Sequence, residues 1–216
     1  MHRGHEIQIL QHRLVLHPLK ALWWPEQSAL ICSDVHIGKG SHFRTNGIPI
    51  PKFVDGSNLW NLVEVIQHYT PKRIIFLGDL FHSTANSEWN ELVDCLDQFP
   101  MMKRILVKGN HEIMGDEQYE QFGFQLHDRL IIDQIEFTHE PIATITDGCF
   151  NICGHVHPAV RLSGTARQSL KIPCFWMTAR CGILPAFGAF TGTHIIRPKK
   201  DDGVYGFLEN QVVKLN

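Results

Sequence analysis

Five short clusters of polar residues follow five apolar, strand-like stretches of this chain. An Asp, Asn or His at the end of a buried strand lies at the rim of a sheet, and neighbouring strands bring such side chains toward one point. Carboxylate, amide and imidazole groups are common ligands of divalent cations. The pattern predicts a metal site at one sheet edge, formed by Asp34–His36, Gly78–Asp79, Gly109–Glu112, His139 and Gly154–His157.

The number of ligands predicts how many metal ions the site holds. Asp34 and His36 are two residues apart, so on an extended strand end both side chains leave the same face. Seven mixed oxygen and nitrogen ligands are too many for one tetrahedral zinc, but they suit two ions that share the carboxylate of Asp79. Two such ions, roughly 3.5 to 4 Å apart, hold a bridging hydroxide for in-line attack on phosphorus. The predicted ligands are Asp34, His36, Asp79, Asn110, His139, His155 and His157.

Length, charge and cysteine usage narrow the class of protein. With 216 residues, the chain is long enough for a single domain with a full hydrophobic core. Its 20 basic residues nearly balance its 22 acidic residues, so any contact with a polyanion must be made by a local patch. No run approaches the roughly 20 apolar residues of a membrane span, and the 6 cysteines form no Cys-x-x-Cys pair. We expect a single-domain cytoplasmic protein with reduced cysteines.

Two kinds of hydrophobic pattern divide the chain. In the first half, apolar runs at 28–33, 74–77 and 104–107 alternate with helical periodicity at 59–69 and 89–99. Strand–helix units of this kind form a mostly parallel sheet through right-handed crossovers. In the second half the apolar runs are short and strand-like, which predicts a second sheet packed on the first.

The amino-terminal region predicts a hairpin around Pro18 at the edge of the first sheet. Its histidines look like surface residues rather than metal ligands. They are His2, His5, His12 and His17.

In type and order, the five clusters resemble the motifs of the calcineurin-like metallophosphoesterase family, over residues 30–160. The resemblance implies an α/β fold, a four-layer αββα sandwich of two mixed sheets with a dinuclear metal site at the strand ends. It also implies two ligand sets that share one carboxylate. The first set is Asp34, His36, Asp79 and His157, and the second is Asp79, Asn110, His139 and His155.

The same resemblance implies a catalytic residue outside the two ligand sets. His111 would stand near the leaving group and protonate the departing oxygen, a role that suits the near-neutral pKa of histidine. Glu112 would orient His111 from outside the ligand sphere. Thr138 departs from the family pattern, because many members carry glycine before the histidine of the fourth motif.

Loops after the first two clusters resemble those of bacterial ligase-associated metallophosphoesterases of the DNA damage response. The segments Gly38–Arg44 and Leu80–Ser83 carry this resemblance. It implies a DNA phosphodiesterase or endonuclease that acts in DNA repair beside a DNA ligase, an exonuclease and a helicase. Cations on the loop that leaves the metal site are candidate substrate contacts, and further basic residues follow the last cluster. These are Lys39, His42 and Arg44, and then Arg161, Arg167, Lys171 and Arg180.

Two other functions fit the same motifs. A nucleotide or other small-molecule phosphoesterase would use the same metal site. A non-catalytic metal-binding scaffold would keep the fold, although the presence of His111 argues against it. We expect two Mn²⁺ ions, because mixed carboxylate, amide and imidazole ligands accommodate this ion, and iron or zinc would also fit.

Overall fold

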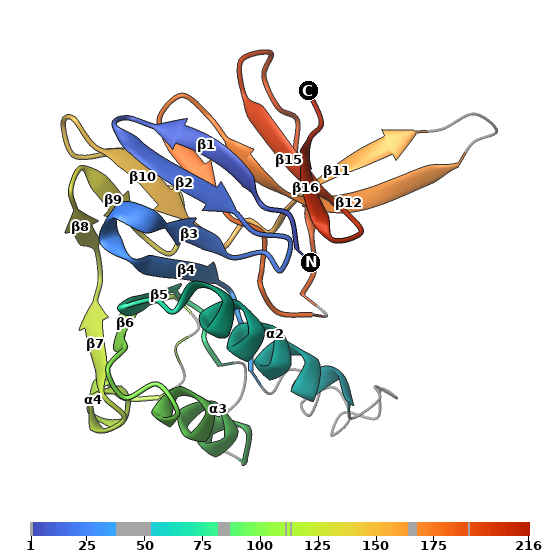
Figure 1. Ribbon diagram of the computed structural model, residues 1–216. Coiled ribbons are helices and arrows are strands. Elements are labelled where there is room, and N and C mark those ends of the chain that lie inside the picture. Colours follow the sequence, from blue (N-terminus) through green and yellow to red (C-terminus); the bar gives the residue numbers. More distant parts are fainter. Residues whose placement is uncertain are drawn as a thin grey trace.

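In the computed structural model, the strands form two sheets that face each other, and helices pack on the outside of the first sheet (Figure 1). The structure describes residues 2–37, 53–81, 87–110, 112, 114–163, 168–189 and 191–216. The predicted α/β protein with two sheets is confirmed. No helix in this part of the chain has both the length and the apolar character needed to cross a membrane.

The first sheet has seven strands, which lie in chain order. Its first three pairings are antiparallel, and the strands from β4 onward are parallel, as the sequence predicts. Ser33, Leu77 and Val107 lie side by side at the ends of three neighbouring strands, so those strands end at one edge. The strands are β1 (His5–Ile9), β2 (His12–Leu16), β3 (Leu22–Trp24), β4 (Ala29–Ser33), β5 (Arg73–Leu77), β6 (Lys103–Val107) and β7 (Phe124–His127).

The second sheet has nine strands and mixes both directions. At its centre β10 is parallel to β9 and to β13. The strand β12 then pairs antiparallel with β11, β13 and β15. The strands are β8 (Leu130–Ile132), β9 (Ile135–Phe137), β10 (Phe150–Cys153), β11 (Pro158–Ser163), β12 (Ser169–Met177), β13 (Cys181–Ile183), β14 (His194–Ile195), β15 (Gly203–Leu208) and β16 (Gln211–Lys214).

Among the described residues, three α-helices cover the outer face of the first sheet. They are α2 (Phe53–Tyr69), α3 (Ser87–Asp97) and α4 (Asp116–Gln121), and a short 3-10 helix, η1, spans Pro25–Gln27. Leu62 of α2, Trp89 of α3 and Tyr119 of α4 are buried in the same hydrophobic cluster.

The fourth layer implied by the resemblance is not formed by helices of the described residues. Phe175 and Met177 of β12 face the core between the sheets, whereas Cys174 faces the opposite side. On that outer face Cys174 packs with Val204 of β15 and with Ile196. The described residues therefore form three layers in the order helix, sheet, sheet.

The amino-terminal region corrects two predictions. The hairpin of β2 and β3 is present, but β1 pairs with β2 and forms the sheet edge in its place. His12 and His17 are only 2% and 1% exposed, so the prediction that both lie at the surface is wrong. His12 Nε2 lies 2.7 Å from the Asp133 carbonyl oxygen, and its ring packs against Trp24.

Candidate metal centre

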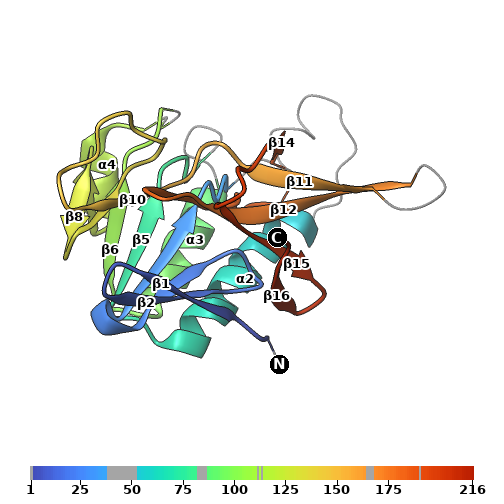
Figure 2. The same cartoon turned by 90° about the horizontal axis from the view of Figure 1, so that it is seen from above.

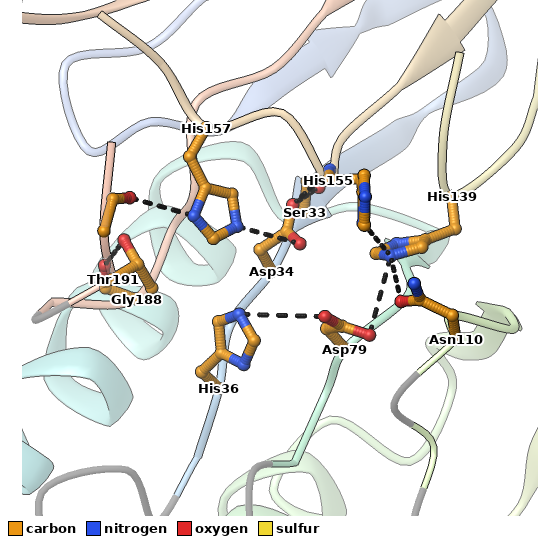
Figure 3. Close-up of polar contacts among 12 residues, drawn as sticks. Ser33, Asp34, His36, Asp79, Asn110, His139, His155, His157, Gly188 and Thr191 are labelled. Carbon is orange, nitrogen blue, oxygen red and sulfur yellow. Dashed lines mark hydrogen bonds and ion pairs between the residues drawn. The ribbon is translucent and has the colours of Figure 1, made fainter. Parts of the chain in front are cut away.

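The polar clusters converge because the strands that precede them end together. Asp34 follows β4, Asp79 follows β5 by two residues, and Asn110 follows β6 by three. From the second sheet, His139 follows β9, and His155 follows β10. Figure 3 shows these side chains pointing toward one another at the facing edges of the two sheets.

The backbone at these positions is not extended. Asp34, His36, Asp79, His155 and His157 have φ values of 51°, 48°, 48°, 63° and 50°. Non-glycine residues rarely adopt this left-handed region, and it costs conformational energy. Asp34 and His36 converge on the site as predicted. They do so through tight left-handed turns after the strand, however, and not because they share a face of an extended strand.

Asp79 lies between two histidines of the predicted ligand sets. Its Oδ2 is 3.9 Å from His36 Nε2, and its Oδ1 is 3.5 Å from His139 Nε2. The carboxylate thus presents one oxygen to each side, which is the geometry that a bridging ligand requires. Asp79 is only 3% exposed.

Asp34 is also near both groups. Candidate ligand atoms of Asp34, His36 and His157 lie within 4.8 Å of one another, and so do those of Asp34, Asp79 and His139. Asp34 Oδ1 is 3.1 Å from His157 Nε2. These buried Asp and His clusters are consistent with a dinuclear metal site.

The second predicted set gathers around His139. Its Nε2 lies 3.2 Å from Asn110 Oδ1 and 3.0 Å from His155 Nδ1. All seven predicted ligands are therefore within one site.

Backbone carbonyl groups determine where two of the histidines carry their protons. His139 Nδ1 lies 3.0 Å from the Leu77 carbonyl oxygen, and His157 Nδ1 lies 2.9 Å from that of Gly192. A carbonyl oxygen only accepts, so each Nδ1 donates a proton, and in the neutral ring Nε2 keeps a lone pair. Those lone pairs point at the oxygens of Asp79, Asn110 and Asp34. A cation is the group that would bind lone pairs facing one another in this way, so the residues fit a metal.

Asp34 is held as an anion. Burial alone would raise the pKa of its carboxyl group. When no cation is bound and His157 is protonated on both nitrogens, its hydrogen bond to Asp34 and its charge, together with the hydroxyl of Ser33, outweigh burial and lower the pKa. The backbone N–H of His155 also donates to Asp34 Oδ2, at 2.9 Å. A carboxylate that stays ionised is the form that binds a metal.

A segment that the sequence analysis did not single out supports the first ligand set. We call residues 184–189 and 191–193 the strap. Phe187 N donates to the Ser33 carbonyl at 2.8 Å, and Gly188 N donates to the Asp34 carbonyl at 3.1 Å. The Gly192 carbonyl of the strap accepts from His157. Ser33 could have been found as the neighbour of Asp34, but Gly192 is 35 residues from His157, and no sequence signal links them.

Most of the predicted catalytic and substrate-binding residues cannot be placed at the site. The catalytic candidate His111 and the substrate candidates Lys39, His42, Arg44 and Arg167 lie outside the described residues. Arg180 is not at the site, because its carbonyl accepts from Asn151 near the start of β10, whereas the predicted metal ligands follow the other end of that strand.

Glu112 anchors the turn that carries Asn110. Its carboxylate accepts from the Tyr119 hydroxyl of α4 and from Gly109 N at 3.3 Å. Burial raises the pKa of this carboxyl group. Its predicted contact with His111 lies outside the described residues.

Thr138 has a structural role that glycine could not fill. Its hydroxyl donates to the Glu140 carbonyl at 2.7 Å and accepts from Asn151 Nδ2 at 2.9 Å. These bonds fix the chain on either side of His139.

Cavities flank the metal centre on two sides. One of about 320 Å³ is lined by Asn110 and His139, together with Lys108 and Arg129. The other, of about 220 Å³, is lined by His157 and by residues of the strap. A substrate that reaches the centre has room on both sides of it.

Comparisons with known proteins cover the part of the chain that contains the site. A family model described as calcineurin-like phosphoesterase matches residues 28–174, which include all seven predicted ligands. Among solved structures, the chain is similar to the crystal structure of Pseudomonas putida nuclease MPE, with a TM-score of 0.80 and 27% sequence identity. That similarity covers 99% of this chain and 100% of the other. No curated protein sequence matches the chain significantly.

Proposed function

The chain belongs to the calcineurin-like phosphoesterase family, and from this premise we propose that it is a metal-dependent DNA phosphodiesterase that acts as an endonuclease. The family accounts for hydrolysis of a phosphoester. The choice of DNA is supported by the full-length similarity to a nuclease, which covers both sheets and the site between them. That similarity is the observation on which the proposal rests.

We assign the two predicted ligand sets to two divalent cations, most simply Mn²⁺. Asp79 would be shared, because its two oxygens face His36 and His139. When bound, such a pair of ions supplies Lewis acidity and an activated water for in-line displacement at phosphorus.

The residues of the chain itself orient the ligands and handle the leaving group. The carbonyls of Leu77 and Gly192 hold His139 and His157 with Nε2 toward the centre. Glu112 and Tyr119 fix the turn before His111. We propose that His111 protonates the departing oxygen, since it directly follows Asn110 in the chain.

The cellular setting is also part of the proposal. A DNA phosphodiesterase with this resemblance would act in DNA repair in the cytoplasm, beside a DNA ligase, an exonuclease and a helicase. Its substrates would then be damaged or single-stranded DNA.

A substrate panel tests the proposal. Protein loaded with Mn²⁺ is assayed against single-stranded and nicked DNA, mononucleotides, cyclic nucleotides and a bis-aryl phosphate, with Asp79→Asn as the control for contaminating activity. We expect internal cleavage of DNA with a higher kcat/KM than for the aryl diester. Preferred turnover of mononucleotides would favour the small-molecule phosphoesterase instead, and turnover of nothing would favour the scaffold.

A further inference from the structure

Cations around the metal centre differ in whether they are already paired. On the side of His139, Lys108 contacts Asp116 at 3.2 Å and Asp128 at 3.1 Å, and Arg129 pairs with the buried Glu136. Ion pairs of this kind neutralise that side. The opposite side, next to His157, contains a lysine that has no ion-pair partner among the described residues.

Lys20 lies in the turn between β2 and β3. Leu22 pairs with Ile31 of β4, so this turn is at the edge of the sheet where Asp34 follows. Lys20 lines the 220 Å³ cavity together with His157, Gly188 and Thr191. The cavity therefore joins a lysine directly to a predicted metal ligand.

The ammonium group of Lys20 has no ion-pair or hydrogen-bond partner among the described residues. Burial lowers the pKa of this group, which reflects the cost of keeping a charge away from water. Lys20 is only partly buried, so its charge is held partly away from water without a partner that would offset the cost. An anion bound in the cavity would supply the missing partner.

The ribbon formed by β11 and β12 extends the positive charge away from the cavity. It projects from the body of the molecule (Figure 2). Arg161 lies directly opposite Lys171, and like charges in that position are unfavourable. Because side chains alternate along a strand, Lys171 shares its face with Pro173, which lines the cavity. Lys171 Nζ also donates to the carbonyl of Thr193, another lining residue, at 3.0 Å.

We propose that Lys20 binds a phosphate of the substrate adjacent to the one being cleaved, and that Arg161 and Lys171 bind the next part of the same phosphodiester chain. Arg161 is three residues along β11 from Pro158 at the cavity, about 10 Å in an extended strand, so the two positions contact different phosphates. This inference rests on the proposed function and specifies its substrate: a strand with several phosphates on the side of His157, rather than a mononucleotide.

Substitution of the cations tests the proposal by comparing two substrates. The variants are Lys20→Gln, Arg161→Gln and, as a matched control, Lys103→Gln, which is exposed at the start of β6, the end opposite the metal site. The substrates are a single-stranded oligonucleotide and bis-p-nitrophenyl phosphate, which has only the reacting phosphate. For Lys20→Gln we expect the ratio of kcat/KM for the oligonucleotide to that for the aryl diester to fall about tenfold, the scale of a charged hydrogen bond. Arg161→Gln, a change at an exposed position, should lower the ratio less.

A second measurement separates phosphate binding from a structural effect. Each lost phosphate contact should make the slope of log kcat/KM against log salt concentration shallower by about 0.7 for a single strand. An equal loss on both substrates, an unchanged salt slope, or an equal effect of Lys103→Gln would overturn the proposal.

Oligonucleotide binding distinguishes this proposal from the proposed function. If the wild-type protein hydrolyses neither substrate, the nuclease proposal has failed. The Kd of a fluorescent oligonucleotide, measured by anisotropy, still decides the inference, because Lys20→Gln should raise that Kd about tenfold. An unchanged Kd would contradict the proposed phosphate contact of Lys20 even in an inactive protein.

Discussion

At the scale of single residues, the site depends on where protons and lone pairs are held. The carbonyl of Leu77 holds His139 Nδ1 as a donor, and that of Gly192 does the same for His157. Each ring therefore presents Nε2 toward the carboxylates. Residue type alone would not establish this, since a histidine can protonate either nitrogen.

The shared position of Asp79 leads to a first prediction. Asp79→Asn removes the negative charge between His36 and His139. We expect the metal content per chain to fall and turnover of bis-aryl phosphate to drop by about 10²-fold or more, because even partners outside the ligand sphere cost up to that factor. Elemental analysis and steady-state kinetics measure both. Asp147→Asn, an exposed aspartate, is the control and should change neither.

The second prediction concerns His111. His111→Ala should leave both metals bound and lower turnover by about 10²-fold, the usual scale for loss of a general acid. A substrate with a good leaving group should be affected less than DNA, because its leaving oxygen needs less protonation. Unchanged turnover on DNA would remove His111 from the mechanism, and lost metal would make it a ligand.

At the scale of elements, the strap shows how a distant segment supports the ligands. It runs between β13 and β14 and bonds to the backbone of Ser33 and Asp34, just after β4. Ala189 N also donates to Asn58 Oδ1 of α2, at 2.9 Å. The strap thus joins the second sheet to the first sheet and its helix layer beside the metal centre.

Two glycines of the strap provide a matched test. A Cβ atom at Gly188 would lie 2.3 Å from the Val35 carbonyl oxygen, whereas a Cβ at Gly192 would meet nothing within 4 Å. Gly188→Ala should therefore displace the strap, with a cost of about 1 to 3 kcal/mol in urea denaturation and weaker metal binding. Gly192→Ala keeps the carbonyl that accepts from His157 and should be nearly neutral. Similar stabilities for the two variants would show that the strap does not pack as described.

At the scale of the whole molecule, the stability comes from two hydrophobic layers. One lies between the helices and the first sheet, and the other lies between the two sheets. In the second layer Trp24 and Phe137 face each other across the sheets, with ring centroids 6.2 Å apart. The alignment of the sheets that this layer fixes is what brings His139 opposite Asp79.

Buried His17 should make the stability of the molecule depend on pH. Burial, with the charges of His2 and His68, lowers the pKa of His17 to about 3, from 6.5 when unfolded. Below pH 6.5 the unfolded chain takes up a proton that the folded chain does not. The free energy of unfolding should therefore fall with acidification between about pH 6.5 and 3. Above pH 6.5, His17 is neutral in both states and takes nothing from the stability.

Comparison with His17→Gln isolates this effect, because every other titrating group is common to both proteins. Between pH 7 and pH 5, the wild-type protein should lose about 1 to 2 kcal/mol more than the variant in urea denaturation. A constant difference between the two proteins over this range would contradict the prediction.

The sequence by itself determined the parallel part of the first sheet and the helices α2 and α3, and it placed the seven predicted ligands at one sheet edge, because these features depend on local patterns. Uninterrupted apolar runs identify buried strands, and a polar residue after each run lies at a sheet edge. Strands without such runs were missed. β1 alternates exposed and partly buried residues, and β13 has only three residues.

Only the tertiary structure decided how the ligands are oriented and supported. The left-handed turns at Asp34 and His157, the bond from His157 to Gly192 and the burial of His17 each depend on contacts between segments far apart in the chain. Such contacts carry no local sequence signal. A pattern of residue types can predict which residues gather at the site, whereas the proton positions of the histidines and the unpaired charge of Lys20 follow from which backbone and side-chain groups the fold places beside them.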